Sequence, residues 1–405
     1  MQKALLVILT PLVAASVAQA DVVTDWNITA GKIIVDAKLG TPPANRVLAI
    51  VQTAVYEAAN AITKRYPASN LQLEAAPGAS VEAAIAAANH AALVKLVPPQ
   101  QAAVDTAFHT ALTKIAEGPA KTAGLAVGEK AAEVILVMHA DDGAAAGETY
   151  RPLTSAGVYV PTAIPVATQW PQRKPWLMSN PAQFRPALPP QLTSEVWARD
   201  YNEIKAVGGK ISTRRTAEQT EIARFWEATL PPIYYGVVRS VATMPGREIT
   251  QNARLFAAVG QAIDDALIAV FDAKYHYQFW RPITAIRNGD IDGNDATERE
   301  PAWTPFIDTP MHPEYPCAHC IVAAAVGMVL QEEIGAGPMP VLTTTSDTAN
   351  GKARSWTKID DFVREVSEAR IYDGVHYRTS TEIGVAMGKK IGALAVAKFP
   401  SPGSR

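Results

Sequence analysis

The amino-acid sequence predicts an all-α fold of two packed helical bundles. Apolar residues recur at spacings of three and four almost everywhere, as Leu48, Val51, Val55, Ala58 and Ile62 do. A convincing alternation of apolar and polar residues is absent, so a large β-sheet is not expected. Of the 405 residues 48% are hydrophobic, which is enough for a sizeable core and excludes wholesale disorder.

The predicted helices follow one another between Pro- and Gly-rich segments. Thr216 and Gln219 stand three residues apart in the pattern of a capping box, which marks a helix start. After the stripe from 48 to 62, the helices are expected at 80–97, 99–117, 120–139, 193–207, 214–228, 248–279, 318–334, 357–372 and 379–398.

Residues 1–20 have the pattern of a secretory signal peptide. Lys3 supplies a positive start, residues 4–17 are almost wholly apolar, and Ala18-Gln19-Ala20 is a small-x-small cleavage pattern. The alternative is an N-terminal anchor helix, for which the run is short. No other stretch reaches the length of a membrane span, so we expect a secreted or periplasmic protein without an integral membrane segment after cleavage.

The charge balance excludes one class of function. The chain carries 37 basic and 39 acidic side chains, a formal net charge of −2. A protein that binds nucleic acid through bulk electrostatics needs a basic excess, so no nucleic-acid partner is expected. Two cysteines cannot build a disulfide-rich scaffold.

A Pro-rich stretch, residues 141–192, separates two helical halves. Its Trp170, Trp176 and Phe184 need burial, so it is interpreted as an ordered strap across the helices. The expected organisation is an N-terminal half, 21–192, which includes the strap, and a C-terminal half, 193–405. Asp264, Asp265 and Asp272 on the predicted helix 248–279 suit either acid–base work or, as we expect, pairing with arginines that holds the helix.

Three clusters in the last third could carry chemistry. Each alone fits a simple structural role, because paired cations are usually solvated and a single histidine is seldom catalytic. Together, three cations and two imidazoles suit a tetrahedral oxyanion, whose charge needs neutralising and whose oxygens accept paired N–H donors. The clusters are Lys274 with Arg281, then His312 with Cys317, Ala318 and His319, then Arg370 with His376.

The second cluster also begins a predicted helix. Pro316 precedes it, so Cys317, Ala318 and His319 fall in its first turn, where free backbone N–H groups and the helix dipole favour an anion. Cys317 and Cys320 form a C-x-x-C, which leaves a disulfide, a redox pair or, with His312, a zinc site open. Surrounding cations disfavour zinc.

The order Lys-x6-Arg-Pro, Pro-x-x-His and Arg-x5-His resembles the signature of the vanadium haloperoxidase and type-2 phosphatidic acid phosphatase superfamily. The segments AVYEAANAI near 54, QFRPALPP near 183, RTAEQTEIARFW near 215 and RPITAIR near 281 resemble its longer, bacterial haloperoxidase-like branch. The resemblance covers most of the chain after residue 20 and implies two packed helical bundles of the vanadium haloperoxidase and acid phosphatase type.

The resemblance also implies roles for individual residues. His376 would bond vanadium in vanadate, or attack phosphorus, and His319 would be the acid–base group at the opposite apex. His312 stands where bromide-type enzymes tend to carry an extra histidine, or it has no role. The residues implied to hold the oxygens of the anion are Lys274, Arg281, Arg370, the backbone N–H of Ala318, and Cys317 in the place of a serine.

Four positions depart from the family pattern. Cys317 and Ala318 replace Ser and Gly, Ala369 replaces a serine, and Ser380 stands where an aspartate orients the metal-bound histidine. A thiol is a weaker donor than a hydroxyl. The partner of His376 is therefore missing or comes from elsewhere in the chain.

These residues predict a vanadium-dependent haloperoxidase-like enzyme. Hydrogen peroxide and halide would be its substrates, vanadate its cofactor, and Lys274 would polarise the peroxide. One alternative is an acid or lipid phosphatase that forms a phosphohistidine on His376, needs no cofactor and takes a phosphate ester. The other is a non-catalytic oxyanion-binding homologue. The oligomeric state stays open.

Overall fold

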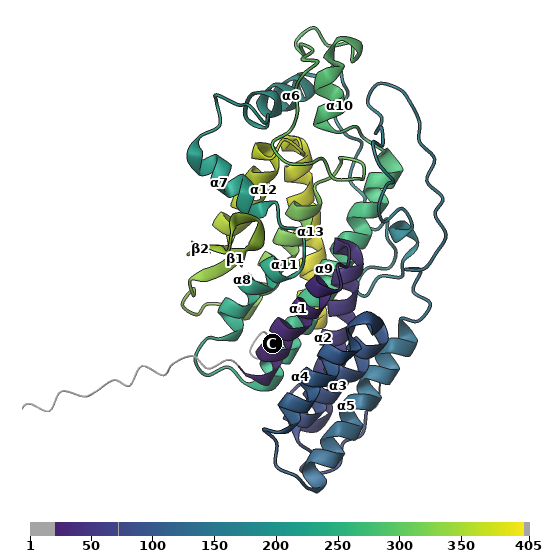
Figure 1. The fold of residues 1–405 in the computed structure, drawn as a ribbon, viewed down its shortest axis with the longest axis vertical. Coiled ribbons are helices and arrows are strands. Elements are labelled where there is room, and N and C mark those ends of the chain that lie inside the picture. Colours follow the sequence, from purple (N-terminus) through teal and green to yellow (C-terminus); the bar gives the residue numbers. More distant parts are fainter. Residues whose placement is uncertain (1–20, 72, 401–405) are drawn as a thin grey trace, which may run out of the picture.

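The structure is a computed structural model that describes residues 21–71 and 73–400, so the predicted signal peptide lies outside the described residues. It is mainly helical (Figure 1). The helices are α1 (Val22–Asp36), α2 (Thr41–Thr63), α3 (Val81–Leu96), α4 (Gln101–Leu112), α5 (Pro119–Met138), α6 (Glu195–Val207), α7 (Ala217–Trp226), α8 (Pro232–Ala242), α9 (Ile249–Tyr277), α10 (Pro282–Arg287), α11 (Ala318–Ile334), α12 (Ile359–Tyr372) and α13 (Arg378–Lys398).

The prediction of an all-α fold is confirmed, and each predicted helix is present within a few residues of its expected bounds. Thr216 caps α7 with the predicted capping box. Three helices were not predicted: α1, α8 and the short α10. Helices α1 and α8 are rich in β-branched and aromatic residues, which favour strands in isolation, and their burial against neighbouring helices overrides that preference.

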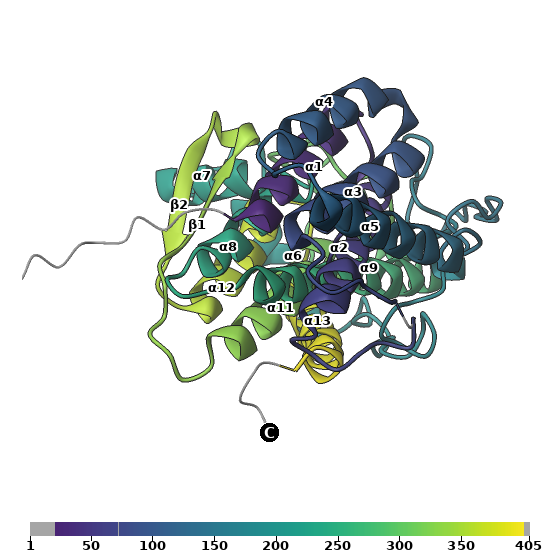
Figure 2. The same cartoon turned by 90° about the horizontal axis from the view of Figure 1, so that it is seen from below.

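Helix α9 is the central element of the fold. All but a few of its side chains are buried, and it packs against α2 on one side and α11 on the other. In Figures 1 and 2, α3, α4 and α5 gather at one end of the elongated molecule, whereas α11, α12 and α13 lie beyond α9. Among the described residues, the larger of two hydrophobic clusters contains residues of both predicted halves, and the smaller one, around Trp197 and Trp280, has all its buried residues in the C-terminal half. The division between the halves stays a prediction.

Glycines let two helix pairs approach closely. A Cβ at Gly388 of α13 would lie 2.2 Å from the carbonyl oxygen of Ile321 in α11, and a Cβ at Gly384 would lie 2.7 Å from that of Cys317. In the other bundle, Gly128 of α5 packs in the same way against Ala84 of α3. Small residues at a spacing of four thus set the distance between α11 and α13, and they fix the start of α11.

The described residues contain one small sheet, an antiparallel hairpin of β1 (Leu342–Ser346) and β2 (Lys352–Trp356). Asn350 and Gly351 adopt positive φ in its turn, as the reversal requires. Its strands are only five residues long and were not predicted, while the expectation that no large sheet forms holds for the described residues.

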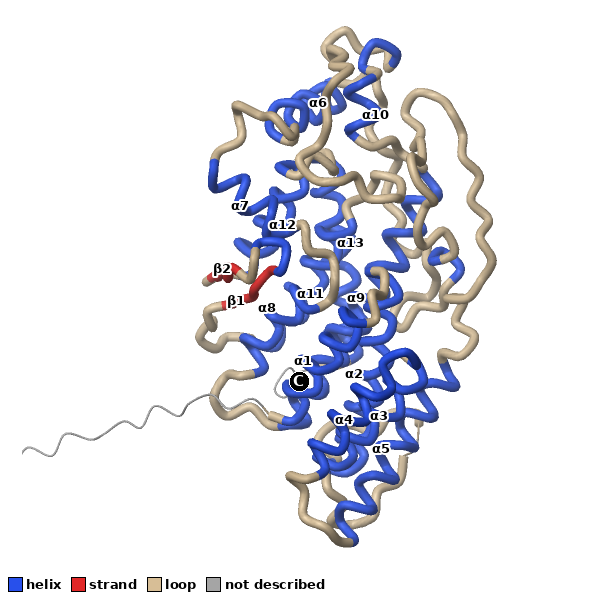
Figure 3. The backbone as a smooth tube through the Cα atoms, viewed as in Figure 1, coloured by secondary structure: helices blue, strands red, loops and turns tan. Residues whose placement is uncertain are grey.

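The strap, residues 141–192, is a long loop segment beside α9 (Figure 3). Polar side chains hold it there. Arg173 pairs with Asp264 of α9 at 2.6 Å, and Arg185 pairs with Asp272 at 2.8 Å. Asp265 accepts the backbone N–H groups of residues 176–178 at 2.7–2.9 Å. The expected arginine pairing is therefore confirmed for two of the three aspartates.

No helix within residues 21–71 and 73–400 combines the length and the apolar character that crossing a membrane requires.

Candidate oxyanion site

Helix ends bring the three sequence clusters together. Lys274 lies in the last turn of α9, and Arg281 immediately precedes α10. Ala318 and His319 open α11, Arg370 lies in the last turn of α12, and His376 follows in the loop before α13. Residues separated by up to 102 positions in the chain therefore meet where these helix ends converge.

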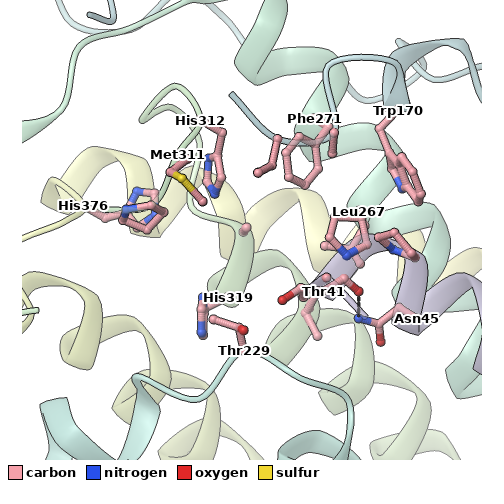
Figure 4. A pocket seen from close by; sticks show the side chains of 18 of the residues that line it. Thr41, Asn45, Trp170, Thr229, Leu267, Phe271, Met311, His312, His319 and His376 are labelled. Atoms are coloured by element: carbon pink, nitrogen blue, oxygen red, sulfur yellow. Dashed lines mark hydrogen bonds between the residues drawn. The ribbon is translucent and has the colours of Figure 1, made fainter. Parts of the chain in front are cut away.

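A cavity of about 420 Å³ opens between them. Its polar end is lined by His312, Ala318, His319, Arg370 and His376. Figure 4 shows His376 and His319 on one side of the cavity, Phe271 and Trp170 on the other, and His312 between them.

Arg281 joins the histidines from behind the cavity wall. Its guanidinium lies 3.0 Å from Nδ1 of His312 and 3.4 Å from Nε2 of His376, and it donates to the backbone carbonyl groups of His312 and Val375. Lys274 is fully buried beside it, and its Nζ donates to the carbonyl oxygens of Pro313 and Glu314 at 3.0 and 2.7 Å. Both cations thus stand directly behind the residues that line the polar end.

The partner of His376, which the sequence left open, is Glu314. Its Oε1 lies 2.8 Å from Nδ1 of His376 and accepts the backbone N–H of Tyr377 at 3.1 Å. A carboxylate at Nδ1 keeps the proton there, so Nε2 presents a lone pair. Sequence reasoning missed Glu314, although it stands inside the second motif, two residues after His312.

A second buried carboxylate, Asp373, pairs with Arg370. Nη1 of Arg370 lies 2.6 Å from Asp373 and also donates to the carbonyl of Trp226 at 2.8 Å. Within the described residues, Nε of Arg370 is buried without a hydrogen-bond partner. Asp373 orients a guanidinium that keeps donor capacity for a ligand.

His319 is half-buried at the cavity wall, and its Nε2 lies 3.2 Å from the carbonyl oxygen of Ala228. A carbonyl only accepts, so this contact places the proton of the neutral ring on Nε2 and leaves Nδ1 as a proton acceptor.

The site has an excess of positive charge. Three cations, Lys274, Arg281 and Arg370, face two buried carboxylates, Glu314 and Asp373. Burial raises the pKa of each carboxylate to about 7. Burial, with the charge of neighbouring arginines, holds the pKa of the Lys274 ammonium well below its usual range.

Burial and the nearby positive charges also lower the pKa values of the three histidines at the site. Burial first, and then the nearby cations, hold the pKa of His312, His319 and His376 well below the ordinary value. All three are therefore neutral at pH 7 in this structure. An anion in the cavity would offset the positive field and make these groups easier to protonate.

Cys317 corrects one sequence prediction. It forms a disulfide with Cys320, their Cα atoms 5.4 Å apart, so it has no thiol hydrogen to donate to an anion. It caps α11 instead, since its Sγ accepts the backbone N–H of Cys320 at 3.2 Å. The same bond removes both thiolates from the zinc alternative, and the described residues contain no cluster of His, Cys, Asp or Glu that could hold a metal ion.

The remaining donors fit a tetrahedral oxyanion. The unpaired Nε of Arg370, the lone pair of His376 and the free first-turn N–H groups of α11 all belong to residues at the polar end of the cavity. Cationic donors and a net positive charge suit a vanadate or phosphate ion.

Comparisons with known proteins agree with this geometry. Residues 254–402 match the family model described as the second helical-bundle domain of VCPO. A vanadium chloroperoxidase of Curvularia inaequalis is 30% identical over 141 residues. That match covers 28% of this chain and 22% of the relative, so the chain spans less than a quarter of the curated protein.

Solved structures extend the likeness to the whole fold. A bacterial vanadium-dependent iodoperoxidase superposes with a TM-score of 0.80 at 23% identity, over 93% of this chain and 95% of that one. A holo-type bacterial vanadium-dependent chloroperoxidase gives 0.67 at 18% identity, over 89% and 92%. The resemblance indicated by the three motifs is confirmed, and the fold is that of the vanadium haloperoxidases.

Proposed function

We propose that this protein, which has the fold of the vanadium haloperoxidases, holds vanadate at His376 and oxidises halide with hydrogen peroxide. The observation that carries the proposal is a cavity lined by Arg370 and three imidazoles, with the buried Lys274 and Arg281 directly behind that lining. The proposal follows the names of the similar proteins, which are a chloroperoxidase and an iodoperoxidase.

His376 is the residue that would bond vanadium, because Glu314 holds its proton on Nδ1 and Nε2 keeps a lone pair, which faces Nη1 of Arg281 at 3.4 Å. Arg281, Arg370 and the first N–H groups of α11 would hold the oxygens of the anion, with Lys274 adding its charge from behind. Bound vanadate supplies a Lewis acid that activates hydrogen peroxide without changing its own oxidation state.

Side chains around the cavity would accept protons and stabilise the charges that form during the reaction. Nδ1 of His319 can accept a proton because Nε2 already donates to the Ala228 carbonyl. His312 lines the cavity and contacts Arg281, so the charge of that guanidinium would influence whether His312 takes up a proton from a ligand in the cavity. Glu314 would stabilise the positive charge that builds up on His376 when Nε2 forms a bond.

The first test measures vanadium retained by purified protein after soaking in vanadate and dialysis. We expect one vanadium per chain, and its loss in His376→Ala. His109→Ala, on the exposed face of α4, is the matched control and should retain vanadium.

The second test measures turnover with bromide or iodide and hydrogen peroxide, and separately with a chromogenic phosphate ester. Halide oxidation that needs vanadate supports the proposal. Ester hydrolysis without halide oxidation would instead identify a phosphatase that uses His376 as its nucleophile. Vanadate binding with neither reaction would identify a non-catalytic oxyanion-binding protein, for which the lost Cys317 donor is a reason.

Export of the protein is also proposed, from the cleavage pattern at Ala20. Expression of the full chain with its first residues in a bacterial host tests it. A mature protein that begins at Asp21 is expected, and uncleaved cytoplasmic protein would contradict it.

A further inference from the structure

The cavity is larger than its polar end requires. Its volume of about 420 Å³ lies within the range of pockets that hold organic ligands, roughly 300–1,000 Å³, whereas a tetraoxo anion has only five heavy atoms. The end away from His376 is lined by Trp170, Leu267 and Phe271, with Thr41 and Asn45 beside them (Figure 4). Val166 also lines the cavity. A halide ion gains nothing from such a surface, but an organic ring does.

At this apolar end, the indole N–H of Trp170 lacks a hydrogen-bond acceptor within the part of the chain that the structure describes. Its side chain is 2% exposed, and its indole N–H has no hydrogen-bond partner among the described residues. A buried N–H without a partner is unfavourable and is uncommon in folded proteins. A ligand oxygen in the cavity would supply the missing acceptor.

The walls of the apolar end are fixed in place. The backbone N–H of Val166 donates to the carbonyl of Met311 at 2.9 Å, and the hydroxyl of Tyr275 donates to the carbonyl of Val166 at 2.5 Å. Ala167, which follows Val166, adopts a φ of 55°, a left-handed conformation that is costly for a residue with a side chain. These hydrogen bonds fix the backbone of the strap beside the candidate oxyanion site, so this wall of the cavity is formed before a ligand binds.

We propose that the apolar end binds the organic acceptor of the halogen, an aromatic compound with an oxygen substituent that accepts the Trp170 N–H. This inference rests on the proposed function, since it places the acceptor within the cavity where halide would be oxidised. The balanced reaction is Ar–H + Br⁻ + H₂O₂ + H⁺ → Ar–Br + 2 H₂O. Bromide loses two electrons, the O–O bond takes them, and the ring exchanges its C–H bond for a C–Br bond.

The binding step is tested without turnover. Equilibrium dialysis of 3-phenylphenol against the protein, with no halide, peroxide or vanadate, should show one saturable site. Val166→Trp fills the cavity and should weaken binding at least tenfold. Ile164→Trp is the matched control, because Ile164 lies on the same strap but is 87% exposed, and it should bind as the unmodified protein does.

Trp170→Phe tests the hydrogen bond. It keeps a ring but removes the N–H, so 3-phenylphenol should bind at least threefold more weakly, while biphenyl, which has no oxygen, should bind equally well. Circular dichroism and thermal melting confirm that each variant is folded. Absence of saturable binding, or equal binding by Val166→Trp, would overturn the inference.

The site of bromination tests the reaction in the cavity. Free hypobromous acid brominates 3-phenylphenol to a characteristic ratio of ring isomers, and the protein should give a different ratio that Val166→Trp returns to that of the free reagent. If bromide is oxidised but the ratio already equals that of the free reagent, the proposed function stands and this inference fails. If 3-phenylphenol binds but no halide is oxidised, the proposed function fails, and the acceptor role fails with it.

Discussion

Replacing Arg173 with methionine should lower the free energy of unfolding by about 3 kcal/mol. The Arg173 side chain is 0% exposed and lies 2.5 Å from Asp142 and 2.6 Å from Asp264. Methionine fills a similar volume, so the cost comes from two buried carboxylates that lose a cation. Asp142 keeps Arg46 at 2.8 Å and Asp264 keeps the indole of Trp176 at 2.9 Å, which places the loss at the lower end of the 3–5 kcal/mol range for a broken buried pair.

The same strap provides the control. Arg185 also pairs with an aspartate of α9, but its side chain is 30% exposed, so Arg185→Met should cost about 1 kcal/mol or less. Urea denaturation at pH 7, followed by circular dichroism, measures both variants. Adding Asp264→Asn to Arg173→Met should recover part of the loss, because it removes the unpaired charge. Equal losses for the two single variants would refute the reasoning.

Acid pH gives an independent check. Burial acts to raise the pKa of Asp142, but hydrogen bonds from His139 and Arg46 and the charge of Arg173 outweigh it and hold this pKa well below its usual value. A lowered carboxyl pKa stabilises the fold above the unfolded-state pKa of about 4, and this stabilisation is lost as the pH falls through the folded-state pKa. The unmodified protein should therefore lose stability below about pH 4, and Arg173→Met should lose less over the same interval.

Three further predictions concern the site. Glu314→Ala should weaken vanadate retention by about tenfold or more, because Nδ1 of His376 loses its partner; retention equal to that of the unmodified protein in the dialysis experiment would contradict this. Sulfate, whose charge is constant from pH 5.5 to 8, should bind the vanadate-free protein more tightly as the pH falls, by up to about tenfold per unit for each proton taken up, since the anion favours the charged forms of Lys274 and the imidazoles. Titration calorimetry measures it, and tighter binding at higher pH would exclude the mechanism. Gly388→Ala should destabilise the protein by about 2 kcal/mol or more and weaken sulfate binding, because its Cβ meets the Ile321 carbonyl at 2.2 Å and displaces the start of α11; an unchanged unfolding curve would count against this packing.

Local sequence patterns were enough to predict most of the helices. Spacings of three and four mark the buried face of a helix directly, and Pro, Gly and the capping box at Thr216 mark the ends. The same patterns failed for α1, α8 and the hairpin, where β-branched residues or short length make helix and strand hard to tell apart without knowing what packs against them.

The cationic and imidazole members of the site were predicted because their spacing along the chain is a property of the sequence. Their hydrogen-bond partners were not. Glu314 approaches His376 across 62 residues. Asp373 stands only three residues after Arg370, at the end of α12, so this spacing was a local signal that the sequence reasoning missed. A sequence shows that an acidic residue is present, but not which buried donor it will face.

What the sequence by itself determined is the helical fold, the three motifs and the charge that an anion would meet, because each depends on residues close together in the chain. Only the tertiary structure decided that Cys317 is bonded to Cys320 and that Glu314 is the hydrogen-bond partner of His376. It also decided that the cavity lined by Arg370 and the histidines has an apolar end. The physical reason is that burial and long-range contacts set which polar groups remain unpaired, and those groups define what the cavity can hold.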